Sequence, residues 1–212
     1  GLGVKSGAVQ TAFSRPARAL GNGHAVEEHD GVRGRPIARW SPLFGEENKE
    51  EIAAIRSRLV RRFGEQRAHM MSDISRNLLV YPNLLIIDSI DITVRIFWPI
   101  APDLMDVTAW QLAPREEKPE LLARRLDNFL TFHGPGGLAT PDDVEAIESC
   151  QAGYKAEGVE WSELSRGMHR EAIAEDELQL RAFWRQWHGH MSGRAKVETN
   201  DPEIRHAVAL AR

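Results

Sequence analysis

Four runs of β-branched and aromatic residues between positions 78 and 112 place the strongest limit on the fold of this chain. The runs cover residues 78–81, 84–87, 92–98 and 105–112. Short connections such as residues 88–91 and 99–103 join them. A parallel pair of strands would need a crossover of about a dozen residues or more. The segments therefore predict neighbouring antiparallel strands.

Helical patterns surround this block of strands. Apolar residues recur at helical spacing over residues 48–71, with arginines on the other faces. Further helices are predicted at residues 118–132, 141–155 and 175–190. Residues 1–40 indicate loops, with short extended pieces at 25–28 and 37–40. Helices grouped beside an antiparallel sheet predict an α+β domain.

Composition argues against several classes of protein. The chain has 212 residues, enough for one domain with a core, and its net charge of −4 gives no basic footprint for nucleic acid. The single cysteine, Cys150, can form no internal disulfide or C-x-x-C metal site, and it fits a cytoplasmic location. Pro82, Pro99 and Pro102 interrupt the longest apolar stretches, so none reaches the about 20 residues of a membrane span.

A segment rich in glycine and proline, followed by two aspartates, is the candidate for a functional site. Residues 133–143 read HGPGGLATPDD and lead into the helix predicted at 141–155. Thr140 or Asp142 can cap this helix, whose dipole favours carboxylates in its first turn. The pattern fits two interpretations. One is an ordinary helix start with an acidic first turn, and the other is a pair of carboxylates beside a flexible loop where a metal binds.

Six separate motifs occur along the chain. They are GNGH at 21–24, YPNL at 81–84, GPGGLATPDD at 134–143, VEAIESCQ at 144–151, SRGM at 165–168 and ELQLRAFWRQW at 177–187. Their content and order resemble the catalytic domain of the large (α) subunit of Rieske-type aromatic-ring-hydroxylating dioxygenases. The residues of these motifs are most similar to those of the branch that acts on benzoate- or p-cumate-like acids. The resemblance covers most of residues 20–193.

The resemblance implies a helix-grip (START/Bet v1-like) fold, in which a curved antiparallel sheet surrounds a long helix. It predicts that helix 141–155 packs against the concave side of that sheet. It also implies a mononuclear, non-haem Fe(II) held by two histidines and one carboxylate, which leave positions open for dioxygen. Asp143 matches the second member of the family's acidic pair and is the predicted iron ligand. Asp142 is predicted to cap the helix or to orient Asp143 through a hydrogen bond.

The histidine ligands are the difficulty in this interpretation. His24 and His29 have the H-x4-H spacing that the family uses for its iron-binding pair. The Glu-Asn…Asp signature of that pair does not precede His24, and the family places the G-N-G-H motif after the iron histidines. We therefore expect the histidine ligands upstream of this chain. The alternative is a triad of His24, His29 and Asp143.

The Rieske cluster is also missing from the sequence. A 2Fe–2S Rieske cluster needs two cysteines and two histidines, and the chain has one cysteine. We expect residues 1–212 to be a single, N-terminally incomplete catalytic domain without the Rieske domain.

Four further residues match positions that lie near the substrate in this family. They are His133, Ala139, Ile147 and Asn83, the last at a strand position facing the cavity. Each has an alternative role as an ordinary core or loop residue. His188 and His190 stand two apart on a predicted helix, where they point in different directions, so we expect them at the surface.

The resemblance implies an enzyme that cis-dihydroxylates an aromatic ring, such as that of an aromatic acid, with O2. Its electrons come from NADH through a reductase or ferredoxin and the Rieske cluster of an adjacent α subunit in a trimer. The sequence leaves the presence of a small β subunit open. The alternative is a non-catalytic helix-grip module, or an inactive fragment, that binds a small ligand without iron. The incomplete metal triad favours that alternative.

Overall fold

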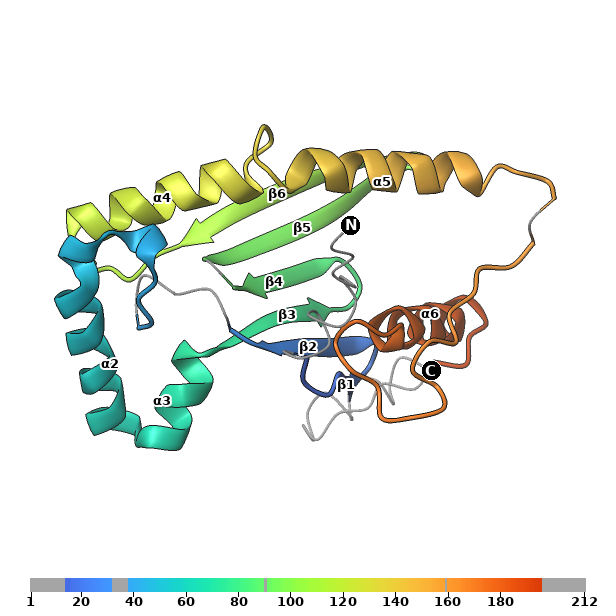
Figure 1. The fold of residues 1–212 in the computed structure, drawn as a ribbon. Coiled ribbons are helices and arrows are strands. Elements are labelled where there is room, and N and C mark those ends of the chain that lie inside the picture. Colours follow the sequence, from blue (N-terminus) through green and yellow to red (C-terminus); the bar gives the residue numbers. More distant parts are fainter. Residues whose placement is uncertain (1–13, 32–37, 90, 159, 196–212) are drawn as a thin grey trace, which may run out of the picture.

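One antiparallel sheet forms the centre of the molecule (Figure 1). The computed structural model describes residues 14–31, 38–89, 91–158 and 160–195. Six strands follow one another across the sheet in chain order. They are β1 (Arg18–Gly21), β2 (His24–Asp30), β3 (Ile74–Val80), β4 (Leu84–Asp88), β5 (Ile92–Ala101) and β6 (Leu104–Leu112). Every neighbouring pair is antiparallel, which confirms the predicted α+β class and the predicted strands between residues 78 and 112.

The extended pieces predicted before residue 40 have different outcomes. The piece predicted at 25–28 is part of β2, whereas β1 was not predicted. The piece predicted at 37–40 lies partly outside the described residues, and residues 38–40 belong to no named strand.

Along one row of paired residues, the two faces of the sheet differ in polarity. Residues paired across neighbouring strands share a face of the sheet. One row of paired residues consists of Glu27, Asn77, Ile87, Thr93 and Gln111. The corresponding row on the other face consists of Val26, Leu78, Ile86, Val94 and Trp110. In this row the first face, called the polar face below, is mainly polar and the second is apolar. Two residues further along the strands, Glu28, Arg76 and Asp88 form ion pairs on the second face.

Gly64 divides the single helix predicted over residues 48–71. The structure has α2 (Lys49–Phe63) and α3 (Glu65–Ser72), and Gly64 between them has a φ of 78°. Glycine adopts positive φ readily and other residues do so at a cost. The chain therefore turns at Gly64, and α3 leads back to β3 (Figure 1). The prediction of one helix was wrong because the apolar spacing continues through the glycine.

A hydrophobic cluster holds α2 against α4 (Pro119–His133). Its buried members are Phe44, Ile52 and Leu121, with Trp40 and Ile55 packed around them. Phe44 belongs to a short 3-10 helix, Pro42–Phe44, and a second one, Glu46–Asn48, leads into α2. Next to this cluster the buried side chain of Arg125 on α4 donates two hydrogen bonds to Glu117, at 2.8 and 2.6 Å. These contacts fix the start of α4, whose other end reaches the pocket described below.

The helix α5 (Thr140–Gly153) follows α4 and lies along β5 and β6 (Figure 1). None of its residues is buried, so the predicted packing against the concave side of the sheet was wrong. Its two large aliphatic side chains, Val144 and Ile147, are 48% and 45% exposed. A helix with so little apolar surface gains little free energy by burying one face.

Polar contacts tie both ends of α5 to the sheet. Asp143 lies 3.9 Å from Arg95 on β5. Gln151 donates to the carbonyl of Pro102 at 3.5 Å, just beyond the end of β5.

The last described helix, α6 (Leu178–Met191), packs on β1 and β2. The ring of Phe183 lies 5.2 Å from that of Tyr81, and Gln179 donates to the carbonyl of Asn77 at 3.1 Å. Along the described parts of the chain, no helix combines the length and apolar character needed to cross a membrane.

Candidate functional site

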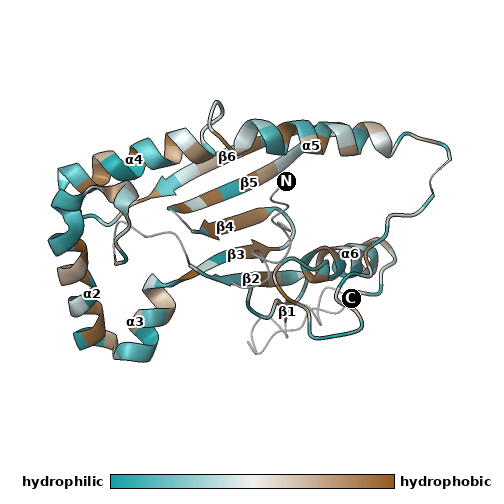
Figure 2. Cartoon of the chain, in the orientation of Figure 1, coloured by the Kyte–Doolittle hydropathy of each residue, from teal (hydrophilic) through white to brown (hydrophobic). Residues whose placement is uncertain are grey.

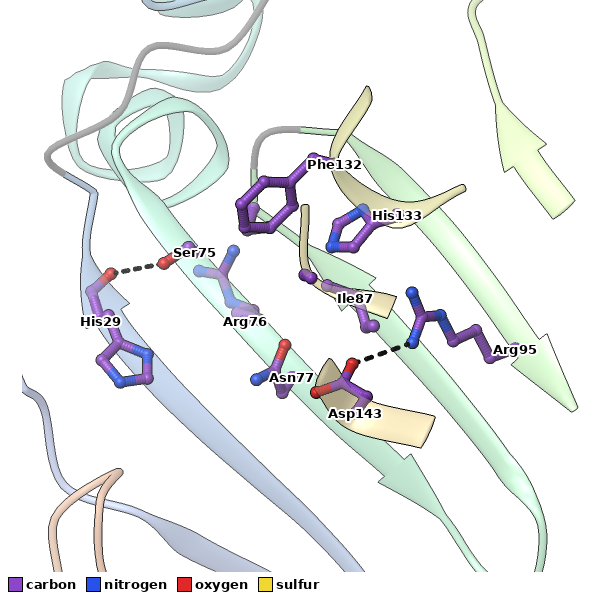
Figure 3. A pocket seen from close by; sticks show the side chains of 11 residues that line it. His29, Ser75, Arg76, Asn77, Ile87, Arg95, Phe132, His133 and Asp143 are labelled. Atoms are coloured by element: carbon purple, nitrogen blue, oxygen red, sulfur yellow. Dashed lines mark hydrogen bonds and ion pairs between the residues drawn. The ribbon is translucent and has the colours of Figure 1, made fainter. Parts of the chain in front are cut away.

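A pocket of about 260 Å³ lies between the polar face of the sheet and the junction of α4 with α5 (Figure 3). The strands contribute His29, Ser75, Arg76, Asn77, Ile87 and Arg95, Ser89 follows the end of β4, and the junction contributes Phe132, His133, Ala139 and Asp143. The cavity therefore combines apolar side chains with several groups that donate or accept hydrogen bonds. This composition is typical of a site for a small organic ligand.

The glycine-rich loop at the α4–α5 junction is tightly bonded to α4. Gly134 donates its backbone N–H to the carbonyl of Phe129 at 2.9 Å, Leu138 to that of Thr131 at 2.8 Å, and Ala139 to that of Phe132 at 3.0 Å. Terminal carbonyls of α4, which the helix leaves without intrahelical partners, are thereby satisfied. The loop was predicted to be flexible, but these bonds hold its backbone in one path.

Close backbone approach explains the glycines of this loop. A Cβ atom at Gly137 would lie 2.8 Å from the carbonyl oxygen of Phe132, and one at Gly134 would collide with the carbonyl oxygen of Leu130. The predicted side-chain cap was wrong: Ala139 is the N-cap of α5, and no side-chain hydrogen bond caps the helix. The hydroxyl of Thr140 instead donates back to the carbonyl of His133 at 2.8 Å.

Asp143 stands in the first turn of α5 at the edge of the pocket. Its side chain is 60% exposed, and Oδ2 lies 3.9 Å from Nη1 of Arg95 (Figure 3). No side-chain hydrogen bond caps α5, so the carboxylate of Asp143 is not used to cap the helix. The carboxylate is therefore available to a ligand from the pocket side.

His133 is the buried wall of the pocket at the end of α4. Its Nδ1 lies 3.1 Å from Oδ1 of Asp91, which also accepts a 2.8 Å hydrogen bond from the hydroxyl of Thr93. The ring of Phe132 meets the imidazole edge-on at 4.9 Å. Asp91 and Thr93 thereby fix the position of the imidazole, which lines the pocket.

The structure brings together three of the five predicted site residues. His133, Ala139 and Asp143 all line the pocket. Ile147 lies further along α5, is 45% exposed and is not part of this lining. Asn83 was predicted on a strand, but it lies in the turn between β3 and β4 and its carbonyl accepts a hydrogen bond from Phe97. The pocket lining instead includes another asparagine, Asn77 on β3, six positions earlier.

The alternative triad of His24, His29 and Asp143 does not assemble. His24 and His29 are five residues apart on β2, so their side chains leave the strand on opposite faces. His29 lines the pocket, whereas Nδ1 of His24 accepts a hydrogen bond from the backbone N–H of Tyr81 at 2.9 Å. Within the described ranges, no group of three or more histidine, cysteine, aspartate or glutamate side chains is arranged to hold a metal.

Sequence reasoning missed the polar residues that the strands bring to the pocket. Arg95 is the clearest, because its side chain is only 10% exposed. A detectable signal existed: Arg95 is the one charged residue in the run ITVRIFW, at a strand position where apolar residues are expected. Ser75 and Asn77 gave no comparable signal, since polar residues are ordinary on one face of an antiparallel strand.

Comparison with known families identifies the chain. Residues 9–193 match the family described as the ring hydroxylating alpha subunit (catalytic domain). The chain belongs to this family. The match confirms the resemblance inferred from the motifs, and Asp143, His133 and Ala139 lie within the matched residues.

Members of the ring-hydroxylating family are also found among curated proteins. The chain is 39% identical over 128 residues to the large subunit of 2-halobenzoate 1,2-dioxygenase from Burkholderia cepacia, covering 60% of this chain and 27% of that protein. It is 38% identical over 130 residues to the alpha subunit of toluate 1,2-dioxygenase from Pseudomonas putida, covering 61% and 27%. The chain thus matches about a quarter of the length of these relatives.

Solved structures of the family share the fold. A naphthalene 1,2-dioxygenase variant bound to phenanthrene superposes with a TM-score of 0.68 at 17% identity, over 85% of this chain and 43% of that one. Naphthalene 1,2-dioxygenase from Rhodococcus sp. bound to indole gives a TM-score of 0.60 at 18% identity, over 90% and 50%. These likenesses confirm that the six-stranded sheet with its helices is the catalytic-domain fold of this family, as the helix-grip prediction stated.

Proposed function

We propose that this chain is the substrate- and iron-binding domain of an aromatic-ring-hydroxylating dioxygenase. In the proposed reaction both atoms of O2 are joined to adjacent ring carbons, giving a cis-dihydrodiol. Two electrons and two protons complete the balance. NADH supplies the electrons through a reductase. The observation that supports the proposal is the position of Asp143: the residue predicted from the sequence as the metal ligand lines a pocket of about 260 Å³, in a chain that belongs to this family.

Within this pocket the chain's own residues bind and orient the ring. The side chains of Ile87 and Phe132 supply apolar surface, and His133, held by Asp91, closes one wall. The bonded loop fixes Ala139 and the first turn of α5 relative to α4. Asp143 is thereby held in a defined position beside the bound ring, as a metal ligand near a substrate must be.

The iron requires ligands beyond those that the structure describes. In the described residues Asp143 contributes one carboxylate, with no cluster that could hold a metal by itself. We propose that two histidines outside the described residues complete a 2-His-1-carboxylate site. Iron(II) bound there would activate dioxygen. The electrons would come from a Rieske cluster outside this chain, in an adjacent α subunit of a trimer with or without a small β subunit.

Iron content of the complete α subunit tests the role of Asp143. Asp143→Ala should lose most of its bound iron, because one of three protein ligands is gone and it is the only charged one. Asp142→Ala is the matched control: it removes a neighbouring exposed carboxylate and should retain most of the metal. Equal iron content in Asp143→Ala and the wild type would refute the assignment.

A second candidate is a non-catalytic module that binds a small ligand in the same pocket. The absence of a metal-holding cluster from the described residues favours it. The two functions differ in one product assay. With reductase, NADH and O2, the complete protein should form a dihydrodiol from an aromatic substrate. Binding of aromatic compounds without iron or product would favour the module.

A further inference from the structure

The guanidinium group of Arg95 is buried in the pocket with part of its hydrogen-bonding capacity unused. Arg95 lies on β5, and its side chain is 10% exposed. Among the described residues, its Nε and Nη2 have no hydrogen-bond partner, although both are shielded from solvent. The third nitrogen, Nη1, is 3.9 Å from Asp143, which is beyond hydrogen-bonding distance (Figure 3). A buried charge in this state lacks both water and a close partner.

The other basic side chains of the pocket lining have closer carboxylate partners. Arg76 donates to Glu28 at 2.8 Å, and Nδ1 of His133 lies 3.1 Å from Asp91. His29 lies 3.4 Å from Glu175. Asp143, the partner of Arg95 at long range, is the residue proposed above to bind iron. When a carboxylate coordinates a metal cation, the cation offsets the negative charge of the carboxylate. Asp143 would then no longer compensate the positive charge of Arg95.

The two unused nitrogens have a geometry that selects the kind of anion. The N–H groups of Nε and Nη2 lie side by side on one edge of the planar guanidinium and point in parallel directions. A carboxylate presents two oxygens at matching spacing, and the pair forms two parallel charge-assisted hydrogen bonds. Ile87 and Phe132, in the same lining, provide apolar surface for the ring to which the carboxylate is attached.

We propose that Arg95 binds the carboxylate of the substrate, and that the substrate is therefore an aromatic acid. This assignment rests on the proposed function for the identity of the pocket and adds the chemical class of its ligand. Arg95 acts as the group that determines specificity: it selects a ring bearing an anionic group over a neutral ring of the same shape.

Binding of benzoate and benzamide to the complete α subunit tests the assignment. The two compounds have nearly the same shape, and only benzoate is an anion. Calorimetry under anaerobic conditions without reductant measures binding with no turnover. Benzoate should bind the wild-type protein about 10- to 100-fold more tightly than benzamide, the difference expected for hydrogen bonds to a charged group.

Variants of Arg95 locate the source of this preference. Arg95→Gln should bind benzoate more weakly than the wild type by the same factor of about 10 to 100, and it should bind benzamide with the wild-type affinity. Arg95→Lys should fall between them, because it keeps the charge and loses the parallel pair of donors. Arg124→Gln is the control: Arg124 lies on α4 outside the pocket lining with a side chain 40% exposed, and its loss should leave both affinities unchanged. Benzamide binding shows that the Arg95→Gln pocket is intact.

Two results would overturn the role of Arg95. One is equal affinity of the wild-type protein for benzoate and benzamide, which needs no variant. The other is an Arg95→Gln protein that keeps the preference for benzoate. The outcomes separate this inference from the proposed function. If the protein dihydroxylates neutral rings and does not prefer acids, the role of Arg95 is refuted and the proposed dioxygenase function stands. If it binds benzoate through Arg95 but oxidises no ring, the dioxygenase function is refuted and the role of Arg95 stands.

Discussion

Glu27 is a carboxyl group that titrates near neutral pH on the polar face of the sheet. Burial raises its pKa from the ordinary 4.5 to about 7, and the neighbouring carboxylates of Glu175 and Glu177 add to the increase. A hydrogen bond from Asn77 opposes it. Asn77 also lines the pocket, so Glu27 is linked to the pocket lining through this hydrogen bond.

The raised pKa of Glu27 predicts a pH dependence of stability. Between pH 4.5 and 7 the folded protein holds a proton that the unfolded chain has released, so the free energy of unfolding falls as the pH rises through this window. The full shift corresponds to about 3 kcal/mol, and we expect roughly half of that because water still screens the carboxyl. Glu27→Gln should lack this decrease.

Urea unfolding at pH 5 and pH 8 measures the effect. The difference between the two stabilities should be smaller in Glu27→Gln than in the wild type by roughly 1.5 kcal/mol. Glu50→Gln, which removes an exposed carboxyl on α2, is the control and should keep the wild-type difference. A pH dependence that Glu27→Gln leaves unaltered would contradict the raised pKa.

At the scale of elements, two glycines with positive φ join neighbouring segments in different surroundings. Gly64 links α2 to α3 with a φ of 78°, and no atom lies within 4 Å of the position a Cβ would take. Gly23 lies in the turn between β1 and β2 with a φ of 81°, and a Cβ there would lie 2.8 Å from the ring of Tyr81 and from Gln186 on α6. The first glycine serves the backbone alone, and the second also lets α6 approach the strands.

Alanine substitutions should separate these two effects. Gly64→Ala should lower the free energy of unfolding by about 1 kcal/mol, the cost of a positive φ. Gly23→Ala should lower it by about 2 to 4 kcal/mol, because an overpacked contact is added to the same backbone strain. Chemical denaturation of both variants beside the wild type gives the comparison. A Gly23→Ala protein as stable as Gly64→Ala would show that α6 tolerates displacement from the turn.

The elements also show which parts of the fold the sequence determines. The strands between residues 78 and 112 were predictable because β-branched runs with short turns leave few other arrangements. The break at Gly64 was not, because a glycine within a helical pattern is compatible with a continuous helix and with a turn. Asp143, His133 and Ala139 were found through a local motif. Arg95 and Asn77 depend on strand register, which a single sequence specifies weakly.

At the scale of the whole molecule, the pocket lies on the polar face of the sheet, and apolar side chains are exposed at other positions of the sheet. The hydropathy view shows hydrophobic residues along β4 and in the second half of β3 (Figure 2). On β6 the side chains of Val107, Trp110 and Leu112 are each nearly half exposed. Within the described residues Asp143 lies in no cluster of side chains that could hold a metal, and the chain matches about a quarter of the length of each curated relative.

The isolated chain of residues 1–212 should therefore bind iron(II) only weakly. One carboxylate at Asp143 is a poor site for iron(II), which imidazole ligands favour. His24 and His29 leave β2 on opposite faces and cannot complete the site together with Asp143. Anaerobic titration with iron(II) should give no saturating site, and His24→Ala should give the same curve. Binding of one iron per chain that His24→Ala abolishes would restore the triad of His24, His29 and Asp143.

The way in which α5 is attached has a mechanical consequence. The hydrogen bonds of Leu138, Ala139 and Thr140 to the end of α4 hold the first turn of the helix. Its other end has the longer 3.5 Å hydrogen bond from Gln151 to Pro102, and no residue of the helix is buried. Asp143 lies in the first turn beside these shorter bonds, where bending of the rest of the helix displaces it least. Substitutions at exposed positions further along the helix, such as Glu145 and Glu148, should therefore leave the carboxylate of Asp143 in place, whereas changes at the end of α4 should move it.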